Sequence, residues 1–209
     1  MSGDQLNWLG EAPSLPEGFL YRREFLSPEE ERSLAQRLAE LPLKPFEFQN
    51  YVGKRRVVSF GWRYAFDGSG LHKADDMPAF LLPLRERAAA LAGLAPGALQ
   101  HVLLTEYAAG AGIGWHKDRS VFGDTIGISL LAPCRFRFRR RRGAKWERAT
   151  LIAEPRSAYL LRGPSRTEWE HSIPEVEELR YSITFRNLRS GSGADSAGDL
   201  LDEGTGDPA

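Results

Sequence analysis

Cysteine is nearly absent from this chain, because Cys134 is the only one among 209 residues. A single cysteine excludes an internal disulfide, and a reducing, intracellular environment is the default for such a sequence. We therefore expect a cytoplasmic protein. The first twenty residues also lack a basic segment followed by an apolar one, so we expect no secretory signal peptide.

Long hydrophobic runs are missing as well. No apolar segment approaches the roughly 18 residues needed to span a bilayer, so we expect no membrane partner. Apolar residues nevertheless make up 42% of the chain and charged residues 27%, a balance typical of a globular domain with a real core. The length fits one domain with short tails, and we expect a monomer.

Basic residues are missing from the last twenty positions, where five of the 28 acids lie: Asp195, Asp199, Asp202, Glu203 and Asp207. Residues 190–209 have too little apolar surface to offset their ordering entropy, and we predict an acidic disordered tail. Residues 1–18 are predicted to lie loosely on the surface, which leaves 19–189 as the domain. Without the tail, 28 basic residues face 23 acids. This charge suits a polyanionic partner, but also an ordinary mixed surface.

Two helices are well marked. Ser27 is placed as an N-cap, with Pro28 at the first helical position, Glu30 completing a capping box and Pro42 ending the element. A second helix is predicted over Pro78–Ala92. The apolar stripes of both helices are explained more simply by core packing than by a binding groove.

From position 100 onward, short strand patterns alternate with turn residues. We predict strands at 101–107, 125–131, 134–140, 149–153, 158–161 and 179–186. In the third strand, apolar side chains alternate with arginines, which gives one apolar and one cationic face. Two helices followed by six strands predict an α+β fold with a mostly antiparallel sandwich or barrel.

The first chemical signal is the pair His116 and Asp118. Alternate residues of an extended segment share a face, so an imidazole and a carboxylate point the same way. His171 is the best third ligand, because His72 lies in a loop and His101 at a strand start. Two histidines and one carboxylate form the facial triad of non-haem iron(II) oxygenases, although the same set also suits zinc in a hydrolytic site.

The last predicted strand places two arginines, Arg180 and Arg186, on one face. Arginines on an inward face are costly unless they meet anions, and a dicarboxylate such as 2-oxoglutarate supplies two. A solvent-facing arginine pair explains the same pattern equally well.

Together these motifs resemble the AlkB family of iron(II)/2-oxoglutarate dioxygenases. The resemblance covers most of 18–188 and is carried by Thr105–Asp118 (TEYAAGAGIGWHKD), His171 and Arg180–Arg186 (RYSITFR). It implies a double-stranded β-helix (jelly-roll) core with N-terminal helices packed on one sheet. It also implies Fe(II), 2-oxoglutarate as co-substrate, and O2.

By this resemblance, His116, Asp118 and His171 are the iron ligands and the catalytic centre. Arg180 is expected to pair with the far carboxylate of 2-oxoglutarate. Arg186 is expected to lie near the carboxylate that chelates iron.

Three further positions belong to the expected co-substrate site. Tyr107 is expected to give its hydroxyl to 2-oxoglutarate. Thr105 and Ser182 stand where the family usually has Asn, and both remain polar. We therefore expect co-substrate binding to survive with altered affinity.

The segment 54–64 falls where family members carry a nucleotide-recognition lid. Arg55 and Arg56 suit phosphates, and Trp62 or Tyr64 suits stacking on a flipped base. Ordinary strand packing is the alternative for the two aromatics. Ser120 stands where DNA-repairing members often carry a second acid, which indicates a different base pocket or a substrate other than a base.

A second cationic segment contains seven basic residues: Arg135, Arg137, Arg139, Arg140, Arg141, Arg142 and Lys145. Basic residues interleaved with aromatics are typical of nucleic-acid binding, whereas a solvated hairpin explains the charge as well.

The resemblance implies oxidative demethylation of N-alkylated bases in DNA or RNA, with release of succinate, carbon dioxide and formaldehyde. In such a reaction the metal carries the difficult chemistry and the protein positions the reactants. Methylated nucleic acid is thus the expected partner. One alternative is an oxygenase acting on a protein side chain or a small molecule. Another is a non-enzymatic binding module, which the intact ligands and arginines disfavour.

Overall fold

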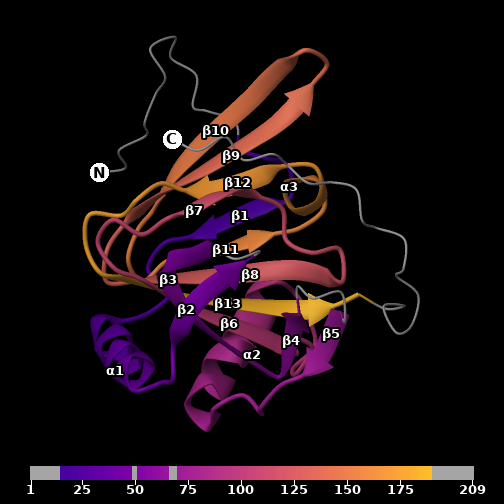
Figure 1. Ribbon diagram of the computed structural model, residues 1–209. Coiled ribbons are helices and arrows are strands. Elements are labelled where there is room, and N and C mark those ends of the chain that lie inside the picture. Colours follow the sequence, from indigo (N-terminus) through magenta and orange to yellow (C-terminus); the bar gives the residue numbers. More distant parts are fainter. Residues whose placement is uncertain (1–14, 49–50, 66–69, 190–209) are drawn as a thin grey trace.

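The computed structural model describes residues 15–48, 51–65 and 70–189 (Figure 1). The predicted acidic tail and most of the predicted loose segment 1–18 lie outside these residues. The described part of that segment is tied to the domain. The amide of Arg162 donates to the Gly18 carbonyl oxygen at 3.2 Å, and the amide of Ser165 donates to that of Glu17 at 2.8 Å.

Two antiparallel sheets form the body of the molecule (Figure 1). The larger has the order β1 (Phe19–Arg22), β11 (Ala158–Leu161), β8 (Phe122–Leu130), β13 (Arg180–Leu188), β6 (His101–Tyr107), β3 (Tyr51–Phe60), β2 (Lys44–Phe48). The smaller has the order β10 (Lys145–Ala153), β9 (Cys134–Arg142), β12 (Glu170–Ile173), β7 (Ile113–His116). A separate hairpin pairs β4 (Trp62–Ala65) with β5 (Gly70–Lys73).

The first predicted helix is confirmed as α1 (Pro28–Ala39), including its capping box. The amide of Glu30 donates to Ser27 Oγ at 3.2 Å, and the amide of Ser27 donates to Glu30 Oε2 at 2.8 Å. Two of the amides at the helix start are thereby satisfied.

The second predicted helix differs in its first turn. Ala79–Leu81 is a 3-10 helix, and α2 itself runs only over Leu82–Leu91. Pro83 explains the break, because proline has no amide hydrogen and is tolerated only in the first turn of an α-helix. No helix in the described part of the chain is long and apolar enough to cross a bilayer.

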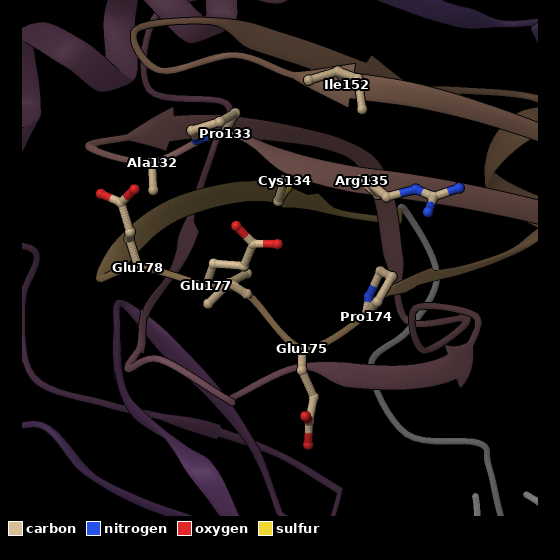
Figure 2. A pocket seen from close by; sticks show the side chains of 10 residues that line it. Ala132, Pro133, Cys134, Arg135, Ile152, Pro174, Glu175, Glu177 and Glu178 are labelled. Carbon is tan, nitrogen blue, oxygen red and sulfur yellow. The ribbon is translucent and has the colours of Figure 1, made fainter.

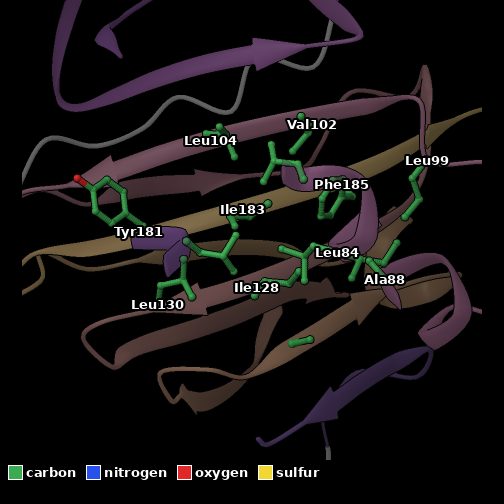
Figure 3. Packing of buried hydrophobic residues seen from close by; sticks show 14 of the residues in the cluster. Leu84, Ala88, Leu99, Val102, Leu104, Ile128, Leu130, Tyr181, Ile183 and Phe185 are labelled. Carbon is green, nitrogen blue, oxygen red and sulfur yellow. The ribbon is translucent and has the colours of Figure 1, made fainter. Parts of the chain in front are cut away.

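The helices cover one face of the larger sheet. In Figure 3, Leu84 and Ala88 of α2 lie against Ile128, Ile183 and Phe185 of the sheet, all buried in one cluster. The other face of this sheet packs on the smaller sheet. There a second cluster combines Phe136, Phe138 and Trp169 with Tyr107, Tyr159 and Leu161.

The alternation of side chains along β13 determines which of its residues face the space between the two sheets. Ile183 and Phe185 belong to the helix-side cluster, so Arg180, Ser182 and Arg186 point the other way. Arg180 is 0% exposed and Arg186 is 8% exposed, which excludes the solvent-facing arginine pair.

Candidate metal centre

Three side chains converge between the sheets. His116 ends β7 and lies directly opposite His171 of β12, with ring centroids 4.3 Å apart. Asp118 follows two residues after His116, just beyond the strand. One ligand atom from each of the three residues lies within 4.8 Å of the others. The residues expected to bind metal are thus brought together by neighbouring strands of the smaller sheet.

Both imidazoles are held neutral. Burial lowers the pKa of His116, and burial together with the nearby His116 lowers the pKa of His171 to about 3. Neutral imidazole is the form that binds metal. His116 Nδ1 lies 2.9 Å from the carbonyl oxygen of Gly114, a contact that orients the ring and leaves Nε2 for a metal.

The carboxylate of Asp118 is held ionised. Burial alone would raise the pKa of Asp118, but the charge of Arg186, helped by that of Arg166, holds it well below its usual range. Arg186 donates from Nη2 to Oδ1 at 2.8 Å and from Nε to Oδ2 at 3.2 Å. Thr125 Oγ1 donates to Oδ2 at 2.7 Å. Arg186 therefore orients a candidate metal ligand directly, a contact that the sequence did not reveal.

Arg180 is buried and has too few partners. Its Nη2 donates to Ser129 Oγ at 2.8 Å, whereas Nε and Nη1 have no hydrogen-bond partner in the described part of the chain. A buried guanidinium with unpaired N–H groups is costly, and a carboxylate would satisfy it as a planar fork. The unpaired N–H groups of Arg180 therefore fit a bound carboxylate.

Two tyrosines adjoin Arg180. The guanidinium lies 5.1 Å from the ring centroid of Tyr107, and burial raises the pKa values of Tyr107 and Tyr159. Both phenols therefore keep their proton and can donate it in a hydrogen bond. Thr105 and Ser182, the other expected co-substrate residues, are buried opposite each other on β6 and β13.

Sequence reasoning missed Ser129 and Tyr159, which come from β8 and β11. The register places Ser129 opposite Ser182, and Gly127 provides the only local signal. A Cβ at Gly127 would lie 2.1 Å from Cζ of Tyr159, so the glycine makes room for that ring. Only the strand pairing shows which ring fills the space.

Arg166 was also missed. It lies in the short helix α3 (Pro164–Thr167) and is 7% exposed, with Nε 3.9 Å from Asp118 Oδ2. Its Nη2 donates to the carbonyl oxygens of Arg119 at 2.5 Å and Phe122 at 3.0 Å. Arg166 thereby connects the loop that follows Asp118 to the carboxylate itself.

The two arginines of the expected lid point in different directions. Arg56 forms a two-pronged ion pair with Glu106, with both N–O distances at 2.7 Å. This ion pair occupies the guanidinium of Arg56, and its expected contact with phosphate stays a prediction. Arg55 has its guanidinium carbon 3.9 Å from the Phe46 ring centroid, and its charge helps to lower the pKa of His116.

The remaining expected substrate residues are Trp62, Ser120 and Tyr64. Trp62 is half-buried in β4, and Ser120 is exposed in the loop between β7 and β8. Tyr64 belongs to β4, and its side chain lies outside the described residues.

A separate cavity of about 230 Å³ lies beside the loop 174–178 (Figure 2). Its lining contains Cys134, Arg135 and three glutamates, and none of the expected site residues. Burial raises the pKa of Cys134, so the thiol stays protonated and unreactive.

The family model of the 2OG-Fe(II) oxygenase superfamily matches residues 18–186. The chain belongs to this superfamily. It is an enzyme, a dioxygenase that uses Fe(II), 2-oxoglutarate and O2, and the cluster of His116, Asp118 and His171 can hold the iron. Membership favours iron over the zinc alternative.

Two curated relatives place this oxygenase among AlkB-like proteins. It is 27% identical over 175 residues to the "Alkylated DNA repair protein ALKBH8 homolog" of Arabidopsis thaliana, covering 70% of this chain and 51% of the relative. It is 27% identical over 170 residues to the "tRNA (carboxymethyluridine(34)-5-O)-methyltransferase alkbh8" of Xenopus tropicalis, covering 78% and 26%. The chain thus spans about half or less of these relatives.

Solved structures confirm the jelly-roll fold. OsALKBH1 matches with a TM-score of 0.61 at 14% identity, covering 83% of this oxygenase and 100% of that chain. A prolyl-4-hydroxylase from Pseudomonas putida matches with a TM-score of 0.57 at 16% identity, covering 82% and 93%.

Proposed function

We propose that this AlkB-like dioxygenase oxidatively removes N-alkyl groups from bases of DNA or RNA. Two observations support the oxygenase part of this proposal. His116, Asp118 and His171 can hold a metal, and the buried Arg180 has two nitrogen atoms, Nε and Nη1, without a hydrogen-bond partner in the described part of the chain. The nucleic-acid half is supported by a relative named for alkylated DNA repair and by the cationic Arg55 near His116.

In this proposal the three clustered residues hold iron(II), which supplies the activation of dioxygen. Arg180 binds the far carboxylate of 2-oxoglutarate, and the Tyr107 hydroxyl donates a hydrogen bond to the same molecule. Arg186 keeps the Asp118 carboxylate in one orientation. These groups are fixed before the co-substrate arrives, so little reorganisation is needed when it binds.

The chain needs no general base for the proposed reaction. Hydroxylation of an N-methyl group gives a product that loses formaldehyde without help from a side chain. The ring of His171 lies 5.4 Å from the centroid of Phe136, within the apolar cluster between the sheets. These side chains limit the access of water to the reacting groups.

Substrate contacts are proposed for Arg55, Trp62, Tyr64 and Ser120. Arg55 and Arg56 are proposed to contact phosphate, and the charge of Arg55 reaches His116. A second candidate function, oxygenation of a protein side chain or a small molecule, is favoured by Ser120. It offers a hydroxyl where DNA-repairing family members often carry an acid.

The test is to supply anaerobically iron-loaded protein with 2-oxoglutarate and then oxygen. A methylated single-stranded oligonucleotide, its unmethylated counterpart or no oligonucleotide is added, and succinate and formaldehyde are both measured. We expect equal amounts of the two products with the methylated strand only. Succinate that is unchanged by any strand would leave the oxygenase intact and move the substrate to proteins or small molecules.

A further inference from the structure

The outer face of the smaller sheet carries a continuous stack of arginines and tryptophans, here called the Arg–Trp ladder: Arg137, Trp115, Arg139, Trp146 and Arg141. Trp115 lies between Arg137 and Arg139, at 4.9 and 4.6 Å from guanidinium carbon to ring centroid. Trp146 lies between Arg139 and Arg141, at 4.5 and 5.1 Å. The members come from β7, β9 and β10, so the ladder crosses the sheet.

The ladder faces away from the core. Phe136 and Phe138 of β9 are buried between the sheets, so the arginines that alternate with them lie on the opposite face. Trp115 lies on this face because it alternates along β7 with His116, which is paired with the inward-facing His171.

Most of the charge on this face is uncompensated. Arg139 is hydrogen-bonded to Glu170, and Arg137 donates to the neutral Ser172 Oγ at 3.1 Å. Arg141 and its exposed neighbour Arg148 have no carboxylate partner in the described part of the chain. The face therefore retains positive charge that a polyanion can neutralise.

Other arginines of the same hairpin behave differently. Arg140 is paired with Glu147 and Glu168, and Arg142 with Glu147. In addition, burial and the charges of Arg135 and Arg139 lower the pKa of Arg137, because like charges lie close together on this face. The uncompensated charge is thus concentrated on the outer face rather than spread over the hairpin.

Geometry favours an extended chain of phosphates as the partner. Alternate residues of a strand lie about 6.6 Å apart, a spacing comparable to that of successive phosphates in an extended single strand. Stacking on tryptophan holds each guanidinium flat and leaves its N–H edge free to fork onto phosphate oxygens.

The ladder also leads toward the metal centre. Trp115 directly precedes His116, and the exposed Lys117 lies between the candidate ligands His116 and Asp118. Lys117 lines one cavity of about 310 Å³ together with Arg139, Arg141 and Trp146. Cationic side chains therefore continue from the outer face to the edge strand that carries the site.

We propose that the Arg–Trp ladder binds the phosphate backbone of single-stranded nucleic acid and guides it past Lys117 toward the metal centre. The identity of the polyanion rests on the proposed function. Binding at this surface is independent of base sequence and of methylation, because the ladder presents guanidinium groups and no base-reading pocket.

The experiment measures binding of an unmethylated single-stranded oligonucleotide to the full chain by fluorescence anisotropy, over a series of salt concentrations. The test variant combines Arg137→Gln with Arg141→Gln. The matched control combines Arg32→Gln with Arg37→Gln, which removes two charges from α1. DNA and RNA strands of one sequence form separate arms.

We expect the ladder variant to bind more weakly and to lose about 1.4 from the slope of log affinity against log salt, since each single-strand phosphate contact contributes about 0.7. The control should keep the wild-type slope. A second variant of this face combines the ladder residue Arg141→Gln with the neighbouring Arg148→Gln. Both side chains are exposed and have no carboxylate partner among the described residues, so this variant guards against a folding defect in the first.

Unchanged binding by both ladder variants would overturn the proposal. So would displacement of the oligonucleotide by an acidic peptide at equal charge concentration, because the ladder would then be a protein-docking surface. No iron, 2-oxoglutarate or methyl group is present in this assay. Failure of the demethylation experiment therefore leaves its result intact, and the two proposals fail separately.

Discussion

Arg180 is the side chain whose environment most clearly calls for a ligand. Replacing it with Met removes a guanidinium whose Nε and Nη1 are buried without a hydrogen-bond partner in the described part of the chain, next to Tyr107. Because a charge-assisted hydrogen bond contributes about 1.5–3 kcal/mol, we expect 2-oxoglutarate to bind roughly 10- to 100-fold more weakly. Calorimetric titration into anaerobic iron-loaded protein measures this.

One companion variant provides a comparison for that result. Ser129→Ala removes the protein partner of Arg180 while leaving the charge, and should weaken 2-oxoglutarate binding less than Arg180→Met does. Iron affinity should stay close to wild type in both. Wild-type 2-oxoglutarate affinity in Arg180→Met would contradict the assigned role.

Arg166 is predicted to position the Asp118 carboxylate, which it approaches at 3.9 Å without donating a direct hydrogen bond. Removal of a residue that orients a metal ligand typically lowers metal affinity by about 10- to 100-fold. We expect Arg166→Met to show that loss in a chelator competition assay. Arg162→Met is the control, since Arg162 pairs with Asp124 instead. Equal iron affinity in both variants would show that the ion pair is incidental.

At the residue scale, sequence could predict the groups carried by short motifs. His116 and Asp118 are two positions apart, and Arg180 and Arg186 share one strand face, so their relation needs no knowledge of tertiary structure. Arg166, Tyr159 and Ser129 reach the site through the pairing of distant strands and the placement of α3. Nothing within a few residues of them indicates a site.

The prediction of helices and strands shows the same difference between local signals and tertiary contacts. The capping box that begins α1 and the apolar alternation of β6 are local, and both were predicted with the observed boundaries or nearly so. Strands β7 and β12 have four residues each, too few for a period to be read, and are defined by their partners. No strand was predicted for β2, which contains Pro45 and lies at the sheet edge, where proline is tolerated.

The hairpin of β9 and β10 shows how a turn sets element length. The sequence predicted strands that end at 140 and begin again at 149, whereas the pairing continues to Arg142 and Lys145. Gly143 adopts a φ of +59°, which glycine tolerates without strain and which permits a two-residue connection. The longer hairpin is what brings Arg141 and Trp146 opposite each other to complete the Arg–Trp ladder.

For the molecule as a whole, burial of histidines predicts how stability depends on pH. Burial, with a smaller contribution from Arg186, lowers the pKa of His101 to about 3, and the pKa of His171 is also about 3, against 6.5 for an exposed histidine. Between these values the unfolded chain binds protons that the folded chain does not. The free energy of unfolding of metal-free protein should therefore fall as pH decreases from about 6.5 toward 3.

Each such histidine contributes a slope of about 1.4 kcal/mol per pH unit. Denaturant unfolding of chelator-treated protein at several pH values in this window measures the combined slope. His101→Gln should reduce the slope by the contribution of one histidine, because the buried ring that takes up a proton on unfolding is then gone. A slope that is the same in His101→Gln and wild type would mean that His101 is protonated in the folded state despite its burial against Phe122.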